Sequence, residues 1–276
     1  MKLNVTLTVC SIALLAACGG GSSAVNNNPT ATTNVQTLKS YSDGSGVLAA
    51  ENTNLGTAGG AANLLIAATN LTAAREVTLG NVNLQEVAGS AVSFGPFFVI
   101  TRTGTASNGA SLVVATVGEN LVSGTEYASI SLVTIDNSRG LLSGGSPVNG
   151  IPSGTYTYSG TSSVIDNVNG SVGDGTFSLT ANFTNNTGTL AATVPANTPV
   201  GSNNPAFFFS SNNLQINQSN GSFSSSNALI GQTGVTSNAA SVNGYFAGTN
   251  ATGVHGVVYT NDLTAPTYAG AFYGSR

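Results

Sequence analysis

The stretch GTFSLTANF, residues Gly175–Phe183, decides the fold class. From Phe177 onward, its apolar side chains occupy the odd-numbered positions and its polar side chains occupy the even-numbered ones. Successive side chains of a β-strand point to opposite faces, so this alternation places one face in a core and the other in water. The stretch therefore predicts a half-buried β-strand, as is usual in antiparallel sheets.

Similar strands follow one another through the second half of the chain, where apolar and aromatic runs alternate with turns of Gly, Asn, Asp and Ser. Eight short antiparallel strands can close into a barrel, which removes the exposed edges that invite aggregation. An outer-membrane barrel is disfavoured, because it needs strands of about 9–11 residues with a lipid-facing apolar band. The predicted strands are Gly154–Gly160, Gly175–Phe183, Gly188–Val194, Phe207–Ile216, Gly221–Leu229, Ala239–Gly248, Val254–Thr260 and Ala265–Tyr273.

The residues before the barrel are also predicted to be β-rich. Ala58–Ala74 is ambiguous, because its Ala- and Leu-rich pattern fits either a short helix or a buried strand. The predicted fold class is therefore all-β, with an eight-stranded antiparallel β-barrel at residues 151–276 preceded by a smaller β-rich domain at residues 34–150. The clearest strands of the first half are Glu76–Ala88, Ser90–Arg102, Ser111–Val117 and Glu126–Ile135.

The N-terminus has the features of a bacterial lipoprotein signal peptide. Lys2 gives a positive start, Leu3–Leu14 is mostly apolar, and Leu15–Cys18 reads as a lipobox. The apolar stretch is shorter than the roughly 20 residues of a transmembrane helix. We expect a signal peptide at residues 1–17, acyl chains such as palmitate on Cys18, and a flexible Gly/Ser/Asn tether at residues 18–33. The alternative is an ordinary secretory signal with a chance cysteine.

The residue that follows the lipobox cysteine indicates which membrane the lipoprotein would reach. Gly19 follows Cys18, and an aspartate is absent from that position. This favours the outer membrane of a Gram-negative cell over the inner one. We therefore expect a lipid-anchored protein that is exposed on the cell surface.

Composition narrows the function classes. Charged residues make up 6% of the 276-residue chain and the formal net charge is −4, whereas soluble domains usually contain about 25% charged residues. A nucleic-acid surface would need clustered Lys and Arg, so nucleic acid is not an expected partner. Cys10 lies in the predicted signal peptide and Cys18 accepts the lipid, so we expect no disulfide in the mature fold.

The chain also lacks the residue sets of common catalytic and metal sites. His255 is the single histidine, and no Gly-x-Ser-x-Gly elbow occurs at a strand–helix turn. A zinc site would need several His or Cys ligands. We therefore expect no enzyme activity, no metal and no cofactor. One catalytic alternative is a glycosidase-type carboxylate pair drawn from Glu76, Glu86, Glu119, Glu126 and Asp136.

Five short motifs stand in order in the second half of the chain: Gly154–Gly160, Gly221–Ser224, Val242–Gly248, Ala251–Val258 and Ala269–Arg276. Together they resemble transferrin-binding protein B-like β-barrel domains, whose ending reads roughly V-x-G-x-F-x-G, A-x-x-x-G-G-x-F and G-x-F-G-x-x-R. In the fourth motif the family's acidic residue is replaced, and the paired glycines are not adjacent. The resemblance covers residues 151–276.

Members of this barrel family are surface lipoproteins of Gram-negative bacteria, and some capture host iron or haem proteins. The resemblance implies a surface protein that binds a host or environmental ligand, with iron or haem acquisition as one expected role. The alternative is a structural or passive surface coat without a dedicated ligand. The expected partners are the membrane, through the lipid on Cys18, and a host protein or haem.

Adjacent aromatic residues are the candidate ligand-binding positions. Phe97 with Phe98, and Phe207 with Phe208, place neighbouring rings on opposite faces of a strand. One ring can enter the core while the other points outward, where it either anchors a partner or packs on the neighbouring domain. Two stretches are long for hairpin connections and are candidate recognition loops: Thr161–Asp174 and Pro195–Pro205.

Glycines recur along the last three predicted strands. In a strand, glycine marks a tight bend or a close backbone approach, which a small barrel needs at its corners. We therefore expect these glycines to shape the barrel rather than to bind a ligand. They are Gly244, Gly248, Gly256, Gly270 and Gly274.

Overall fold

The computed structural model consists of β-strands and their connections throughout the residues that it describes. These residues are 33–35, 38–40, 47–50 and 63–69, and then 82–276 apart from gaps at 88, 91, 106–108, 110, 123–125, 136–137, 167–168, 199–202, 236 and 262–266. The predicted signal peptide, Cys18 and the tether lie outside the described residues. The all-β fold class predicted from the sequence is confirmed.

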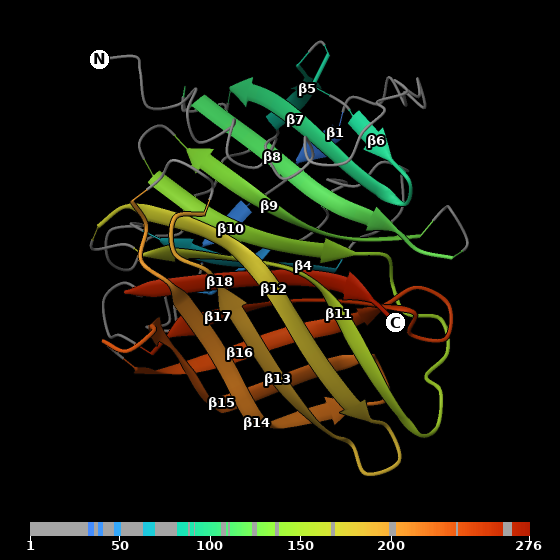
Figure 1. The fold of residues 1–276 in the computed structure, drawn as a ribbon. Helices are drawn as coiled ribbons and strands as arrows, with labels where there is room; N and C mark the ends of the chain where they lie inside the picture. The colour runs from blue at the N-terminus through green and yellow to red at the C-terminus, as the bar shows by residue number, and fades with distance from the viewer. Residues whose placement is uncertain are drawn as a thin grey trace.

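The N-terminal part forms a ten-stranded antiparallel sheet, which lies above the barrel in Figure 1. Its order is β1-β5-β7-β8-β9-β10-β4-β3-β2, and β6 pairs with β7 beside this path. Its strands are β1 (Thr33–Val35), β2 (Leu38–Ser40), β3 (Val47–Ala50), β4 (Asn63–Thr69), β5 (Val82–Glu86), β6 (Val92–Phe94), β7 (Phe97–Thr105), β8 (Ser111–Asn120), β9 (Tyr127–Ile135) and β10 (Ser138–Gly145).

The C-terminal part forms a closed barrel of eight antiparallel strands, which confirms the predicted architecture. Each strand pairs with the next along the chain, and β18 returns to pair with β11. The division between residues 150 and 151 stays a prediction. The barrel strands are β11 (Thr155–Asp166), β12 (Ser171–Asn182), β13 (Thr187–Val194), β14 (Phe207–Asn217), β15 (Ser222–Gln232), β16 (Asn238–Ala247), β17 (Gly253–Thr260) and β18 (Tyr268–Ser275).

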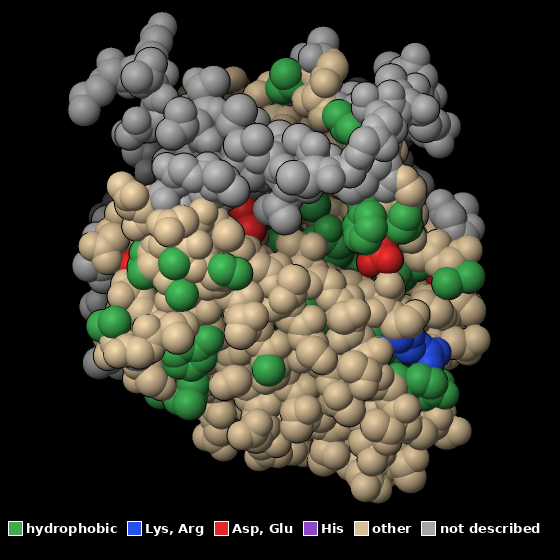
Figure 2. All heavy atoms as spheres, viewed as in Figure 1, with side chains coloured by type: hydrophobic (Ala, Val, Ile, Leu, Met, Phe, Trp, Pro, Cys, Tyr) green, Lys and Arg blue, Asp and Glu red, His purple; other side chains and the backbone are tan. Residues whose placement is uncertain are grey.

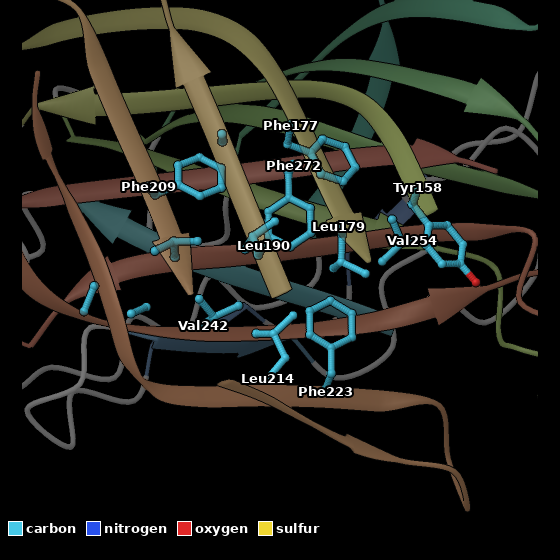
Figure 3. Close-up of a cluster of buried hydrophobic side chains, with 14 of the residues drawn as sticks. Tyr158, Phe177, Leu179, Leu190, Phe209, Leu214, Phe223, Val242, Val254 and Phe272 are labelled. Carbon is cyan, nitrogen blue, oxygen red and sulfur yellow. The ribbon is translucent and has the colours of Figure 1, made fainter. Parts of the chain in front are cut away.

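Aromatic rings fill the interior of the barrel (Figure 3). The ring of Phe246 lies 4.8 Å from that of Phe183 and 5.2 Å from that of Phe223, measured between centroids. Phe177 and Phe272 approach to 4.9 Å. All five rings are buried, and such pairs stabilise a core beyond the area that they bury. The interior of the barrel, as far as it is described, is therefore filled by side chains and does not enclose a ligand cavity.

Glycines in the last three strands make room for these rings. A Cβ atom on Gly244 would lie 2.5 Å from an edge carbon of Phe223, and one on Gly256 would lie 2.6 Å from Phe272. The steric role expected of the glycines is consistent with these contacts. Small and large inward residues thus complement one another across the barrel, as close packing requires.

The N-terminal sheet covers one side of the barrel wall. Every residue of β17 is buried, and so is every residue of β18 up to Gly274. A strand that is buried on both faces has one face in the barrel and the other against a second layer. We call this second contact the sheet–barrel interface; its apolar cluster is Ala115, Ala128, Ile130, Leu132, Leu141, Ile165, Val172, Val257, Tyr259, Ala269, Ala271 and Tyr273.

Two carboxylates tie the sheet to the barrel beside this cluster. Glu126 precedes β9, and its two carboxylate oxygens accept hydrogen bonds from the backbone N–H and the hydroxyl of Thr249, both at 2.8 Å. Glu119 of β8 accepts a bond from the hydroxyl of Ser275 at 2.8 Å. Both glutamates are among the five candidates for the alternative carboxylate pair, and the structure places each in a contact with the barrel.

Three sequence predictions need correction or completion. Ser90–Arg102, predicted as one strand, is a hairpin of β6 and β7 that turns at Gly95–Pro96; Gly95 has φ +59°, a conformation that glycine adopts without strain. The prediction of a loop at Thr161–Asp174 is wrong, because β11 and β12 pair through most of this segment. The ambiguous Ala58–Ala74 contains a strand, β4.

Candidate binding groove on the barrel wall

A polar groove of about 340 Å³ lies on the barrel wall across β14 to β17. This volume falls in the range of about 300–1,000 Å³ that is usual for small-molecule sites. None of its ten lining residues carries a charge, and nearly all offer an amide or a hydroxyl. We call it the barrel-wall groove; it is lined by Asn213, Gln215, Ser224, Ser225, Ser226, Asn227, Ser241, Val242, Asn243 and Tyr259.

The groove forms where the strand ladder is interrupted. In the β15–β16 pairing, the register shifts between Ser225 and Ala228. The β14–β15 pairing omits residues 225–227 as well. Such bulges bend a strand and separate it from its neighbours. Asn227 has no partner in either strand pairing, and its backbone N–H donates instead to the hydroxyl of Ser225 at 3.1 Å.

Hydrogen bonds hold several lining side chains in place. The Nδ2 of Asn243 donates to the hydroxyl of Tyr259 at 2.9 Å. The Nε2 of Gln215 donates to the Oδ1 of Asn213 at 2.7 Å. Each of these two donating amides keeps its carbonyl oxygen to accept a bond from a ligand. The groove can therefore orient hydrogen bonds to a polar molecule without presenting a charge.

The predicted aromatic positions lie elsewhere. Phe207 is buried inside the barrel, and Phe98 is buried in the sheet. Phe97 and Phe208 are only partly buried, so each pair does divide between two environments as the alternation predicted. None of the four lines the barrel-wall groove, and a ligand-binding role for them stays a prediction.

The groove residues were missed by the sequence reasoning. Their signal is a run of polar residues, Ser224–Asn227, which breaks the alternation of β15. The remaining candidate loop, Pro195–Pro205, does connect β13 to β14. Within it the backbone N–H of Asn197 donates to the carbonyl of Asn204 at 2.9 Å, which closes the described part of the loop on itself.

His255 lies in the sheet–barrel interface rather than in the groove. It occupies β17, the seventh barrel strand, as predicted, and it is fully buried. Its Nδ1 lies 3.1 Å from the hydroxyl of Ser143 in β10, while its Nε2 has no hydrogen-bond partner. Burial lowers the pKa of His255 to about 3. The imidazole is therefore neutral and packs as part of the interface.

Asp174 is a second buried titratable group on the outer face of the barrel. The hydroxyl of Ser163 donates to its Oδ1 at 2.5 Å, and its Oδ2 has no hydrogen-bond partner. Burial raises the pKa of Asp174 to about 6, and the bond from Ser163 only partly opposes this. The charged carboxylate is therefore poorly compensated at neutral pH.

Replacing Asp174 by asparagine should stabilise the protein at neutral pH. Because the native pKa of Asp174 is raised from 3.8 to about 6, its contribution to stability is full below pH 3.8 and is lost as the pH rises through 6. The shift corresponds to about 3 kcal/mol. In urea unfolding, Asp174→Asn should gain about 2–3 kcal/mol at pH 7.5 and only about 0.5 kcal/mol at pH 4.

Asp166 provides the matched control. It is also buried, but its carboxylate accepts bonds from the side-chain amides of Asn169 at 2.8 Å and Gln232 at 3.2 Å. Asp166→Asn places an amide against these donors and should lose stability at pH 7.5. A loss of stability in Asp174→Asn at pH 7.5 would contradict the buried-charge interpretation.

The described residues contain no group of three or more His, Cys, Asp or Glu side chains placed to hold a metal ion. They also contain no helix long and apolar enough to cross a bilayer.

Solved structures of transferrin-binding protein B are similar to this chain. A double mutant from Haemophilus parasuis Hp5 is 16% identical with a TM-score of 0.46, over 83% of this chain and 46% of that one. The isotype 1 protein of serogroup B Neisseria meningitidis is 15% identical with a TM-score of 0.43, over 83% and 46%. A mutant from Actinobacillus pleuropneumoniae H49 is 13% identical with a TM-score of 0.37, over 88% and 98%.

These structures come from the family that the C-terminal motifs resemble, and the likeness concerns the fold alone. The chain spans less than half the length of the first and second of them. No protein-family profile and no curated protein matches the sequence.

Proposed function

We propose that the chain is a non-catalytic surface protein of the bacterial envelope, anchored through lipid on Cys18, that binds a host or environmental ligand. The observation that carries this proposal is the barrel-wall groove, which has the volume of a ligand site and holds several polar side chains in fixed positions. The packed interior leaves the outer surface as the place where a ligand can bind. Iron or haem acquisition is the finer role implied by the family resemblance.

A passive surface coat is the second candidate. It is favoured by the described surface in Figure 2, most of which consists of uncharged polar side chains and backbone. An uncharged, hydrated surface offers few anchors to partners, because aromatic residues and arginine carry most binding hot spots. The two candidates differ in one respect that can be measured: only the first requires saturable capture of a ligand.

A pull-down with the purified full-length chain, against host serum and a haem panel, tests the binding function. The matched variant is Gln215→Leu/Asn243→Leu, which removes two amides from the groove while keeping similar side-chain volume. We expect saturable capture by the parent chain, and at least about a tenfold loss of affinity in the variant, since each hydrogen bond to a ligand is worth about 1 kcal/mol or more. Absence of any saturable capture would support the coat instead. Saturable capture that the variant leaves unchanged would place the ligand on another surface and contradict binding in the groove.

A further inference from the structure

We propose that the barrel-wall groove binds an uncharged, hydroxyl-rich ligand, and specifically a neutral glycan. This inference rests on the ligand-binding function proposed above and names the chemistry of its ligand. It follows from the kinds of atoms that line the groove, from their fixed positions and from the pairing of the strands beneath them.

The lining selects against charged and apolar ligands. None of the ten lining residues can form an ion pair, so a charged ligand would lose hydration without compensation. Val242 is the single aliphatic member of the lining. An apolar ligand would cover the amide oxygens of Gln215 and Asn243, which the internal bonds of the groove leave unpaired, without replacing their hydrogen bonds to water. The ligand must therefore be neutral and must carry many hydrogen-bonding groups.

Neighbouring sugar hydroxyls match the amides of the groove. An amide side chain offers an acceptor and two donors side by side, and a hydroxyl can both donate and accept. Bonds to Asn213 and Tyr259 fix the nitrogen ends of Gln215 and Asn243, respectively. These bonds favour one orientation of each amide before a ligand arrives, and the partly buried bond of Asn243 restricts its side chain most, which lowers the entropy that binding must remove.

A peptide strand is a poorer fit. Extended peptides bind by adding to an exposed sheet edge, where the backbone has unpaired hydrogen-bonding groups. Strands β14, β15 and β16 are each paired on both sides, and the closed barrel has no such edge. The β14–β15 pairing is interrupted only at residues 212–214 and 225–227, and local side-chain bonds satisfy the backbone N–H groups of Asn213 and Asn227. Recognition here must come from side chains, which suits a glycan.

A glycan array tests the inference, with neutral oligosaccharides of glucose, galactose and N-acetylglucosamine printed beside sialylated and sulfated counterparts. The full-length chain should bind neutral glycans at least about tenfold better than the charged counterparts. Gln215→Leu/Asn243→Leu should lose at least about tenfold in affinity, the effect expected for two lost hydrogen bonds. Thr157→Val/Thr180→Val, which removes an exposed hydroxyl pair on β11 and β12, should change affinity by less than about twofold.

The possible outcomes separate this inference from the proposed function. All three proteins must show the same far-ultraviolet circular dichroism and melting temperature, so that loss of binding reports the groove. Equal binding of charged glycans, or neutral binding that the groove variant retains, would overturn the glycan inference. Capture of a haem or a serum peptide that depends on the groove, without glycan binding, would overturn the inference while keeping the proposed function. Absence of any saturable capture would overturn both.

Discussion

Replacing Gly274 by valine should destabilise the protein by about 3 kcal/mol or more, because the new side chain has no room at the seam that closes the barrel. Gly274 of β18 faces Gly160 of β11 across this seam. A Cβ atom at position 274 would overlap the carbonyl oxygen of Ser159 and lie 2.9 Å from the Cα of Gly160. Backbone atoms cannot rotate away as the end of a side chain can, so the two strands would have to separate.

Thermal unfolding of the full-length Gly274→Val chain measures this effect. Its melting temperature should fall by about 6–12 °C, since 1 kcal/mol corresponds to about 2–4 °C in a protein of this size. Thr157→Val, at an exposed position of β11, is the control and should shift the melting temperature by less than about 2 °C. An unchanged melting temperature for Gly274→Val would mean that the seam is more open than the structure shows.

Acidification should weaken the sheet–barrel interface through His255. Burial lowers the pKa of His255 from 6.5 to about 3, so the unfolded chain takes up a proton at pH values where the native protein does not. The contribution of the neutral His255 imidazole to the free energy of unfolding is complete above pH 6.5, and it is lost as the pH falls toward 3. The loss is about 3 kcal/mol at pH 4.5 and about 5 kcal/mol once the pH is below 3.

The comparison of His255→Asn with the parent chain isolates this contribution. Asparagine does not titrate, and its short side chain can still reach toward Ser143. Urea unfolding between pH 7.5 and 4.5 should show the parent chain losing about 3 kcal/mol more than the variant. Because Asp174 is present in both chains, its opposite pH dependence cancels in the difference. Parallel pH profiles for the two chains would show that His255 is protonated in the native state as readily as in the unfolded chain.

The barrel could be predicted from the sequence because its signal is local. Gly175–Phe183 and Thr187–Val194 alternate between a filled interior and water, and the structure keeps this pattern. The alternation of apolar and polar residues is lost where the N-terminal sheet covers the outer face of the barrel. The last residues of β11, Val164 to Asp166, are all buried and show no alternation, so their sequence predicts a loop where the structure has a strand. Burial by a distant part of the chain cannot be read from the segment itself.

Other misses have equally specific causes. Strand β10, Ser138–Gly145, was not predicted, because its glycines and serines lack the β-branched residues that mark a strand. The hairpin at Gly95–Pro96 was hidden by the apolar residues on both sides of it. The barrel-wall groove depends on a register shift between β15 and β16 and on a gap in the β14–β15 pairing, and both are properties of paired strands. Its serines and amides look like any solvated strand face until the partners are known.

Hydrogen–deuterium exchange of the full-length chain, with and without the ligand that it captures, is the most direct test of binding on the barrel wall. If the groove holds the ligand, backbone amides in residues 213–215, 224–227 and 241–243 should exchange more slowly in the complex. Protection confined to the Pro195–Pro205 loop, or to the segments that contain Phe97 and Phe208, would contradict binding in the groove and favour the surfaces predicted from the sequence.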